Sequence, residues 1–192
     1  MADLVGQSLG RYHILEQLGE GGMVVTNNEE FAHTLRMLRD WGQERKYHHV
    51  LKGFNYRMEG VQGAILRVKL RHLDGWTEAR RRHAALYNER LAEVDVQKPV
   101  EMPYAKHVYH VYAIRTPKRD LLQESLQAQG IQTGIHYPIP VHLQKAYADF
   151  GYGAGDLPVT EQAANELLSL PMFAELTDSQ IEVVCAAVRK AL

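Results

Sequence analysis

The sequence has little cysteine, little net charge and no long apolar run. Its 192 residues include one cysteine, Cys185, which excludes an internal disulfide and any zinc site built from several thiolates. The formal net charge of −1 provides no overall basic field for nucleic acid or an anionic membrane. No apolar run approaches the roughly 20 residues that cross a bilayer, and Asp3 stands where a signal peptide needs apolar residues. We therefore expect a cytoplasmic protein with no nucleic-acid and no membrane partner.

The composition is otherwise that of an ordinary globular protein. Apolar residues make up 45% of the chain and charged residues 23%, so disorder is not expected. Apolar, β-branched runs predict strands at residues 11–18, 23–26, 108–115 and 131–137. Apolar residues at helical spacing predict helices near residues 28–42, 58–73, 76–91, 116–130, 160–168 and 177–188. Because strands alternate with helices, the fold class is α/β or α+β. Pro99 and Pro103 bracket the best candidate for a hinge between subdomains.

The Gly-rich turn at residues 19–22 is a first candidate site, because backbone N–H groups in such turns bind phosphate. With the strand predicted before it, residues 9–23 resemble the first strand and nucleotide loop of bacterial Ser/Thr protein kinases. No lysine follows on a next strand, and the sequence contains no His-Arg-Asp triplet. We therefore expect residues 1–22 to be a kinase-like leader without kinase chemistry and not a folded domain.

The ten histidines do not form a recognisable metal-binding pattern. His48 and His49 are adjacent, so on regular structure they point apart. His107 and His110 are three apart on a predicted strand, which places them on opposite faces. Neither pair has a carboxylate at a familiar ligand spacing, so we predict no metal site.

Two polar turns are candidate ligand sites. Asn55 and Arg57 lie in a loop that leads into the predicted helix at residues 58–73, and an amide and a guanidinium suit phosphate or carboxylate. His136 and Tyr137 lie where a predicted strand runs into two prolines, a rigid turn that can present both side chains to a ligand. The residues alone leave plainer interpretations open, namely a loop that caps its own helix and a half-buried aromatic turn.

Four segments in order resemble a known family over residues 18–192. The chain is similar there to the C-terminal half of the DegT/DnrJ/StrS family of sugar aminotransferases, which have the fold-type I aminotransferase fold and use pyridoxal 5′-phosphate. The resemblance implies a small C-terminal α+β domain at residues 94–192, preceded at residues 23–93 by a remnant strand and helices of the large domain. The segments that carry it are residues 19–27 (GEGGMVVTN), 53–58 (GFNYRM) with 62–64 (QGA), 107–112 (HVYHVY) and 134–138 (GIHYP).

The resemblance also implies roles for the two polar turns. It assigns Asn55, and with it Arg57, to the cofactor phosphate of a neighbouring subunit, since the family works as dimers with shared active sites. It assigns His136 and Tyr137 to the sugar-nucleotide side of the cleft. The implied partners are a nucleotide-linked keto-sugar, an amino donor such as glutamate, and a second copy of the chain.

The family's Schiff-base lysine belongs to a segment shortly before the Gly-rich turn, and none of the lysines here occupies that motif. The kinase-like residues stand in its place, which suggests a fusion of two fragments within residues 18–23. We therefore assign no catalytic residue and expect the chain to be inactive alone. The alternative function is a non-catalytic binding or self-assembly module that buries exposed strand edges and helix faces.

Overall fold

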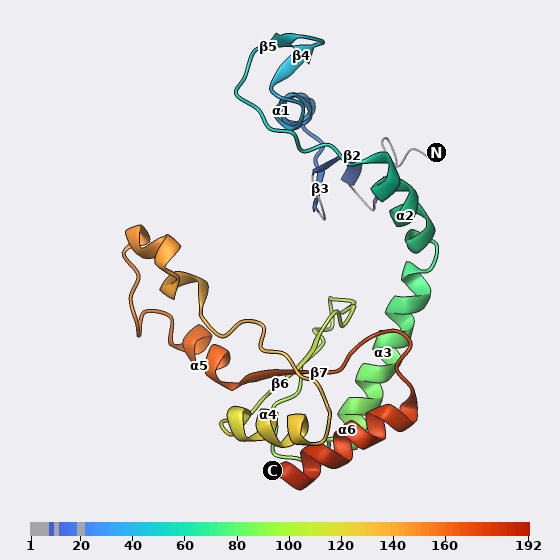
Figure 1. Cartoon of the computed structure of the whole chain (residues 1–192), viewed down its shortest axis with the longest axis vertical. Coiled ribbons are helices and arrows are strands. Elements are labelled where there is room, and N and C mark those ends of the chain that lie inside the picture. The colour runs from blue at the N-terminus through green and yellow to red at the C-terminus, as the bar shows by residue number, and fades with distance from the viewer. Residues whose placement is uncertain (1–7, 10–11, 19–21) are drawn as a thin grey trace. The chain divides into compact units, whose positions relative to one another are not determined.

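The computed structural model describes residues 8–9, 12–18 and 22–192 (Figure 1). The chain folds as two compact units, which meet between Arg71 and His72 in the sequence. The first unit is residues 1–71 and the second is residues 72–192. The boundary predicted between residues 93 and 94 is a different one: it separates the part that resembles the family's large domain from the part that resembles its small domain. It stays a prediction. None of the helices in the described part of the chain is both long and apolar enough to cross a membrane.

The first unit combines a small sheet with two helices. The strands predicted at residues 11–18 and 23–26 are confirmed, and they pair antiparallel. Asn28 caps the first helix, because its Oδ1 accepts a hydrogen bond from the N–H of Phe31 at 2.9 Å. A short strand pair lies where we predicted only a loop. The elements are β1 (Ser8–Leu9), β2 (Tyr12–Leu18), β3 (Gly22–Val25), α1 (Glu29–Arg39), β4 (Gln43–Arg45), β5 (His48–His49) and α2 (Gly60–Leu70).

The second unit packs three helices around a two-stranded antiparallel sheet (Figure 1). The long helix α3 and the helix α4 both pack against the C-terminal helix α6. Thr177 and Gln180 form a capping box at the start of α6, where the sequence predicts a helix near residues 177–188. The elements are α3 (Leu73–Arg90), β6 (Tyr112–Arg115), α4 (Arg119–Ala128), the 3₁₀ helices η1 (Val141–Leu143) and η2 (Lys145–Phe150), α5 (Pro158–Glu166), β7 (Leu167–Leu170) and α6 (Asp178–Ala191).

Three sequence predictions in this unit are wrong in extent. The strand predicted at residues 108–115 begins only at Tyr112, because Tyr109 has φ of 47° and interrupts the extended backbone. The strand predicted at residues 131–137 is reduced to one bridge, in which Gly134 and Ser169 exchange backbone hydrogen bonds of 2.7 and 3.1 Å. Leu167 begins strand β7 instead of ending a helix. Backbone pairing with β6 makes residues 167–170 extended, and the spacing of apolar residues in the sequence does not reveal that pairing.

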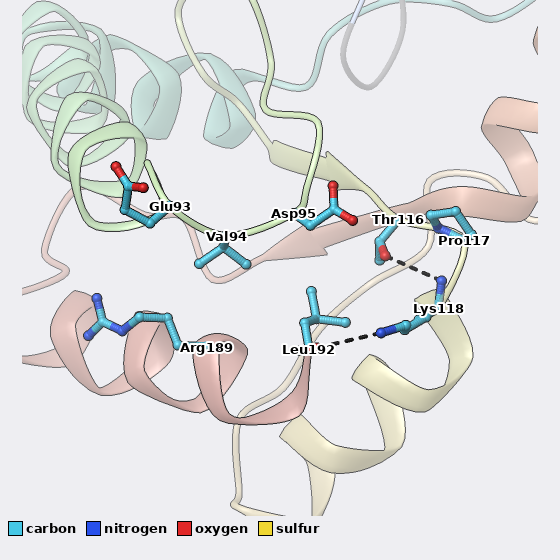
Figure 2. Close-up of a pocket in the computed structure, with 8 residues that line it drawn as sticks. All are labelled: Glu93, Val94, Asp95, Thr116, Pro117, Lys118, Arg189 and Leu192. Atoms are coloured by element: carbon cyan, nitrogen blue, oxygen red, sulfur yellow. Dashed lines mark hydrogen bonds between the residues drawn. The ribbon is translucent and has the colours of Figure 1, made fainter.

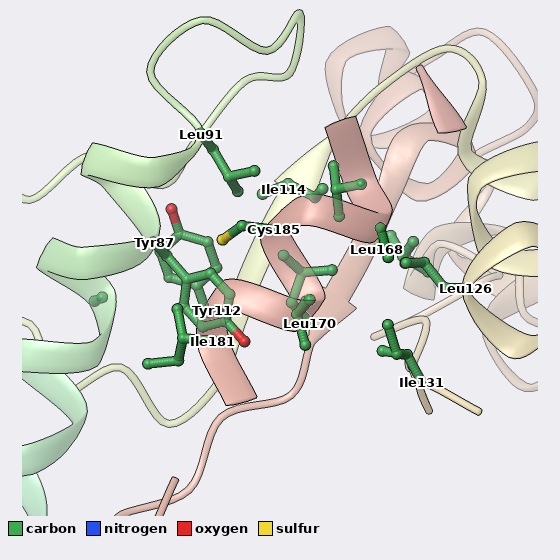
Figure 3. Close-up of a cluster of buried hydrophobic side chains, with 14 of the residues drawn as sticks. Tyr87, Leu91, Tyr112, Ile114, Leu126, Ile131, Leu168, Leu170, Ile181 and Cys185 are labelled. Atoms are coloured by element: carbon green, nitrogen blue, oxygen red, sulfur yellow. The ribbon is translucent and has the colours of Figure 1, made fainter. Parts of the chain in front are cut away.

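The core of the second unit lies between the sheet and the helices α3, α4 and α6 (Figure 3). Tyr87 and Tyr112 stack with ring centroids 4.7 Å apart. The Tyr87 hydroxyl donates to the Pro171 carbonyl at 2.9 Å, and the Tyr112 hydroxyl donates to Asn88 Oδ1 at 2.6 Å. Both phenols are therefore buried with a partner, and their burial raises the pKa of each well above the usual range.

Candidate functional site

The segment that carries Asn55 is fixed to the C-terminal end of α1. The N–H of Trp41 donates to the Phe54 carbonyl at 2.9 Å, and Asn55 pairs with Asp40 in an antiparallel bridge. The backbone around Asn55 is therefore held in place, while its side chain is exposed to solvent.

Two glycines allow this close approach of backbone to backbone. Gly42 has φ of 71°, and a Cβ atom there would lie 1.8 Å from the Leu51 carbonyl oxygen. A Cβ atom at Gly53 would lie 2.1 Å from the Gly42 nitrogen. Any side chain at either position would separate the two strands of backbone, so glycine at both positions is a requirement of this loop.

Asn55 and Arg57 lie on the same side of an extended segment. The rings of Phe54 and Tyr56, which alternate with them, stack at 5.1 Å with an interplanar angle of 9°. Because side chains alternate sides along extended backbone, the amide of Asn55 and the guanidinium of Arg57 both lie on the opposite side from those rings. This alternation puts two polar side chains with N–H donors on one side of the segment.

Asp40 organises the polar side of this segment. Its carboxylate accepts hydrogen bonds from the side chains of Gln43 and Arg57. The hydrogen bond from Gln43 and the guanidinium of Arg57 lower the pKa of Asp40 below its usual range. One N–H group of the Arg57 guanidinium is therefore bonded within the chain, to Asp40. The other N–H groups of the guanidinium are the ones that a ligand would use.

An open hollow of about 680 Å³ lies beside this carboxylate. Its lining includes the cationic side chains of Lys46 and Arg57 and the single carboxylate of Asp40. Asn55 is not among the lining residues. On the segment itself, the exposed amide of Asn55 and the guanidinium of Arg57 are donors that suit an anion such as a phosphate. The lining residues are Asp40, Trp41, Gln43, Lys46, Tyr47, His49 and Arg57.

His136 and Tyr137 lie in the second unit, at the end of the sheet that β7 forms. The imidazole Nδ1 of His136 is 2.9 Å from the Ser169 hydroxyl oxygen on β7. A Cβ atom at Gly134 would lie 2.7 Å from His136 Cε1, so the ring folds back over Gly134 and a side chain there would displace it. Tyr137 points outward and is 74% exposed. The structure thus anchors His136 and presents Tyr137 to solvent.

A second hollow, of about 500 Å³, lies where α6 meets the segments that flank β6 (Figure 2). The sequence analysis missed it, because its residues come from three distant parts of the chain. Its cationic groups have partners: Lys118 Nζ is 3.5 Å from the Leu192 carbonyl, and Arg189 donates to Glu182 and to the Arg90 carbonyl. The arrangement is that of a structural junction. The lining is Glu93, Val94, Asp95, Thr116, Pro117, Lys118, Arg189 and Leu192.

The predicted site residues therefore fall into two local groups. Asn55 and Arg57 share one side of a segment in the first unit, and His136 and Tyr137 are neighbours in the second unit. Within the described residues, no three His, Cys, Asp or Glu side chains gather into a cluster that could hold a metal ion.

Comparisons with known proteins agree over nearly the whole chain. The sequence model of the DegT/DnrJ/EryC1/StrS aminotransferase family matches residues 8–189. A pleiotropic regulatory protein of Geobacillus stearothermophilus is 48% identical over 181 residues, which are 93% of this chain and 47% of that protein. The dTDP-3-amino-3,4,6-trideoxy-alpha-D-glucose transaminase of Streptomyces venezuelae is 42% identical over 186 residues, 96% of this chain and 48% of that protein. The crystal structure of S. venezuelae DesV has a TM-score of 0.84 at 44% identity and covers 88% of this chain and 46% of that one.

These matches bear on two sequence predictions. The chain spans about half the length of the relatives it matches. The family match begins at residue 8, inside the segment that we took for a kinase-like leader, and β1 and β2 pair with each other there. The comparisons therefore give no support for a kinase-like leader or for a fusion within residues 18–23.

Proposed function

Because the chain belongs to the DegT/DnrJ/EryC1/StrS aminotransferase family, we propose that it forms the C-terminal part of a nucleotide-sugar aminotransferase. The family depends on pyridoxal 5′-phosphate. The reaction is the transfer of an amino group from an amino acid such as glutamate to a nucleotide-linked keto-sugar. Residues 23–93 correspond to part of the large domain and residues 94–192 to the small domain, and the protein works as a homodimer in the reducing cytoplasm.

Asn55 and Arg57 are the cofactor-binding residues in this proposal. The observation that carries it is their common side on an extended segment that is pinned to α1, with the stacked rings of Phe54 and Tyr56 on the other side. Pyridoxal 5′-phosphate, when bound, supplies the electron sink for amino transfer. The Asn55 amide and the Arg57 guanidinium donate hydrogen bonds to a phosphate that the neighbouring subunit holds, and Asp40 keeps the guanidinium oriented.

His136 and Tyr137 are the substrate-binding residues. The imidazole is anchored through Nδ1 on Ser169, so Nε2 is the ring nitrogen left to face a substrate. The exposed phenol of Tyr137 provides a hydroxyl that donates or accepts a hydrogen bond. A keto-sugar offers hydroxyl and carbonyl oxygens to such groups, so the pair orients the sugar.

The 192-residue polypeptide by itself is inactive in this proposal, because none of its lysines occupies the family's cofactor-binding motif. The test is incubation with pyridoxal 5′-phosphate, glutamate and a panel of nucleotide-linked keto-sugars. We expect no amino transfer. Turnover that disappears when one of its own lysines is replaced would contradict the proposal.

The role of Asn55 is tested in a family-length protein, made by joining residues 24–192 to the N-terminal half of the S. venezuelae transaminase. Asn55→Ala should weaken pyridoxal 5′-phosphate binding by about ten- to a hundredfold, the value of one charge-assisted hydrogen bond. Asn165→Ala, which removes an exposed amide on α5, is the matched control and should bind normally. The loss should appear in the dimer only. Equal affinity for all three proteins would remove Asn55 from the site.

The alternative function, a binding or self-assembly module, rests on α2. None of the residues of this helix is buried, and Val61, Ile65 and Val68 are all more than half exposed. An apolar face of this kind is typical of an interface. Self-association of the 192-residue chain without cofactor binding in the fused protein would favour the alternative over the aminotransferase.

A further inference from the structure

Residues 136–142 form a strap, the segment from His136 to His142, that is pinned at both ends by histidine side chains. At its start, His136 Nδ1 lies 2.9 Å from the Ser169 hydroxyl on β7. At its end, His142 Nε2 lies 3.0 Å from Glu161 Oε1 in the first turn of α5. Tyr137 stands between the two pins, so both of them bear on where its phenol is presented.

The strap is stiff between its pins. Pro138 and Pro140 fix φ at two of the five intervening positions, and Pro140 has φ of −55° and ψ of 145°, the polyproline II conformation. A segment of this kind transmits the position of one end to the other, because few of its dihedral angles are free to change. Displacing His142 therefore displaces Tyr137.

The Glu161 side chain, which holds the second end of the strap, is itself held by several hydrogen bonds. Besides His142, its carboxylate accepts backbone hydrogen bonds from Gly155 at 2.9 and 3.0 Å and from Leu157 at 3.3 Å. His142 is 9% exposed, which makes it one of the few buried polar residues among residues 24–192. The Glu161 carboxylate thus holds together the end of the strap, the loop at residues 151–157 and the start of α5. The hydrogen bonds from His142 and Gly155 lower the pKa of Glu161 below its usual range, so the carboxylate is ionised at neutral pH.

We propose that Glu161 is a positioning residue for the nucleotide-sugar half of the amino-transfer reaction, acting through His142 and the proline strap on Tyr137. This inference rests on the proposed function in one respect, the assignment of His136 and Tyr137 to the substrate. The pinning itself rests only on the contacts given above. The hydrogen bonds of Glu161 all lie within residues 142–161, away from Asn55 and Arg57, so we expect cofactor binding to be unchanged when Glu161 is replaced.

The first measurement tests the pinning on the 192-residue chain. Glu161→Ala should speed amide hydrogen exchange in peptides that cover residues 137–144 and 151–157 by about tenfold, since it removes hydrogen bonds to a charged acceptor. Peptides from α3 and α6 should exchange as before. Asn165→Ala, on the same helix, is the matched control and should change neither region. Unchanged exchange in Glu161→Ala would overturn the proposal, whatever the activity of the protein.

The second measurement tests the consequence in the family-length fused protein. Glu161→Ala should raise KM for the nucleotide-linked keto-sugar by roughly tenfold, with kcat and the glutamate half-reaction within about twofold. Glu161→Gln, which keeps an acceptor oxygen at the same place, should recover most of the loss and also covers the case in which the alanine variant folds poorly. A parallel fall of both half-reactions would mean a general structural role and would overturn the proposal. If the unaltered fused protein transfers no amino group, the proposed function fails, and the exchange measurement alone decides the pinning.

Discussion

The two units of the chain differ in what holds them together. The second unit has a continuous core of buried side chains from α3, β6, α4, β7 and α6 (Figure 3). In residues 24–71, the part of the first unit whose burial is described, Ala32 is the single buried hydrophobic residue. The second unit therefore has the packing of an independent domain, whereas residues 24–71 bury few apolar side chains.

This difference fits a chain that corresponds to about half of a longer protein. Burial of apolar surface is the main stabilising term in folding, so elements that bury little gain little from their own unit. We expect the exposed side chains of α2 to find further surface to pack against in a protein of family length. The comparison predicts that substitutions in the second unit affect folding and that substitutions in the first unit affect association.

The largest expected effect is the loss of a core ring from the second unit. Tyr112→Ala removes a fully buried ring that stacks on Tyr87, and it should lower the free energy of unfolding by about 4 kcal/mol. Val61→Ala, at a 72% exposed position of α2, should change it by less than about 0.5 kcal/mol. Urea unfolding followed by near-ultraviolet circular dichroism measures both. Similar losses for the two variants would refute the contrast between the units.

The next effect is on thiol reactivity. Burial raises the pKa of Cys185 to about 11, so little thiolate is present at pH 8. Its labelling by a disulfide reagent should be slower than that of an exposed thiol by roughly two orders of magnitude. A second protein provides the exposed thiol for comparison: it carries Val61→Cys on α2 and Cys185→Ser. Its cysteine should be labelled at the rate of a cysteine in a free peptide. Equal rates would show that the core of the second unit opens freely.

A smaller effect is expected on self-association. Ile65→Lys places a charge on the exposed apolar face of α2 and should weaken association of the 192-residue chain by about tenfold. Sedimentation velocity over a range of concentrations measures it. Glu44→Gln, which changes the net charge by the same +1 at an exposed position outside α2, is the matched control. A chain that is monomeric before any substitution would contradict the expected association.

The smallest effect is on how the free energy of unfolding of the second unit depends on pH in the acid range. The hydrogen bond from the Arg81 guanidinium, with that from the His107 N–H, lowers the pKa of Glu101 in the folded chain. A lowered folded pKa contributes stability above the ordinary glutamate pKa of about 4.3 and loses it as the pH falls through the folded value. Glu101→Gln should therefore be less stable than the parent at pH 6, and the difference should shrink below pH 4. A constant difference across that range would exclude the linkage.

Local signals predicted much of the fold. Asn28 and the Thr177–Gln180 pair marked helix starts, because a cap depends on residues within three positions. The strand at residues 167–170 was missed because Leu167 and Leu168 also suit a helical stripe, and pairing with β6 decides between the two. The local pattern likewise gave no indication of contacts between residues far apart in the sequence, such as that of Tyr87 with Pro171.

The candidate site shows the same division. Its residues, Asn55 and Arg57 among them, came from motifs, but the contacts that hold them did not. Asp40 meets Arg57 across 17 positions, and Glu161 meets His142 across 19. Such partners depend on how the chain folds back, which spacing does not encode. The Gly-rich turn at residues 19–22 misled in the opposite way, since a short glycine motif is common to unrelated families.

The measurement that tests the contrast between the units most directly is amide hydrogen exchange of the 192-residue chain, alone and fused through residues 24–192 to the N-terminal half of a relative. We expect β6, β7 and α6 to be equally protected in both proteins, because their core is complete within the second unit. We expect α2 to gain protection only in the fused protein, where its apolar face has a partner. Equal protection of α2 in both proteins would contradict the account, since the first unit would then be stable without the remainder of a family-length protein.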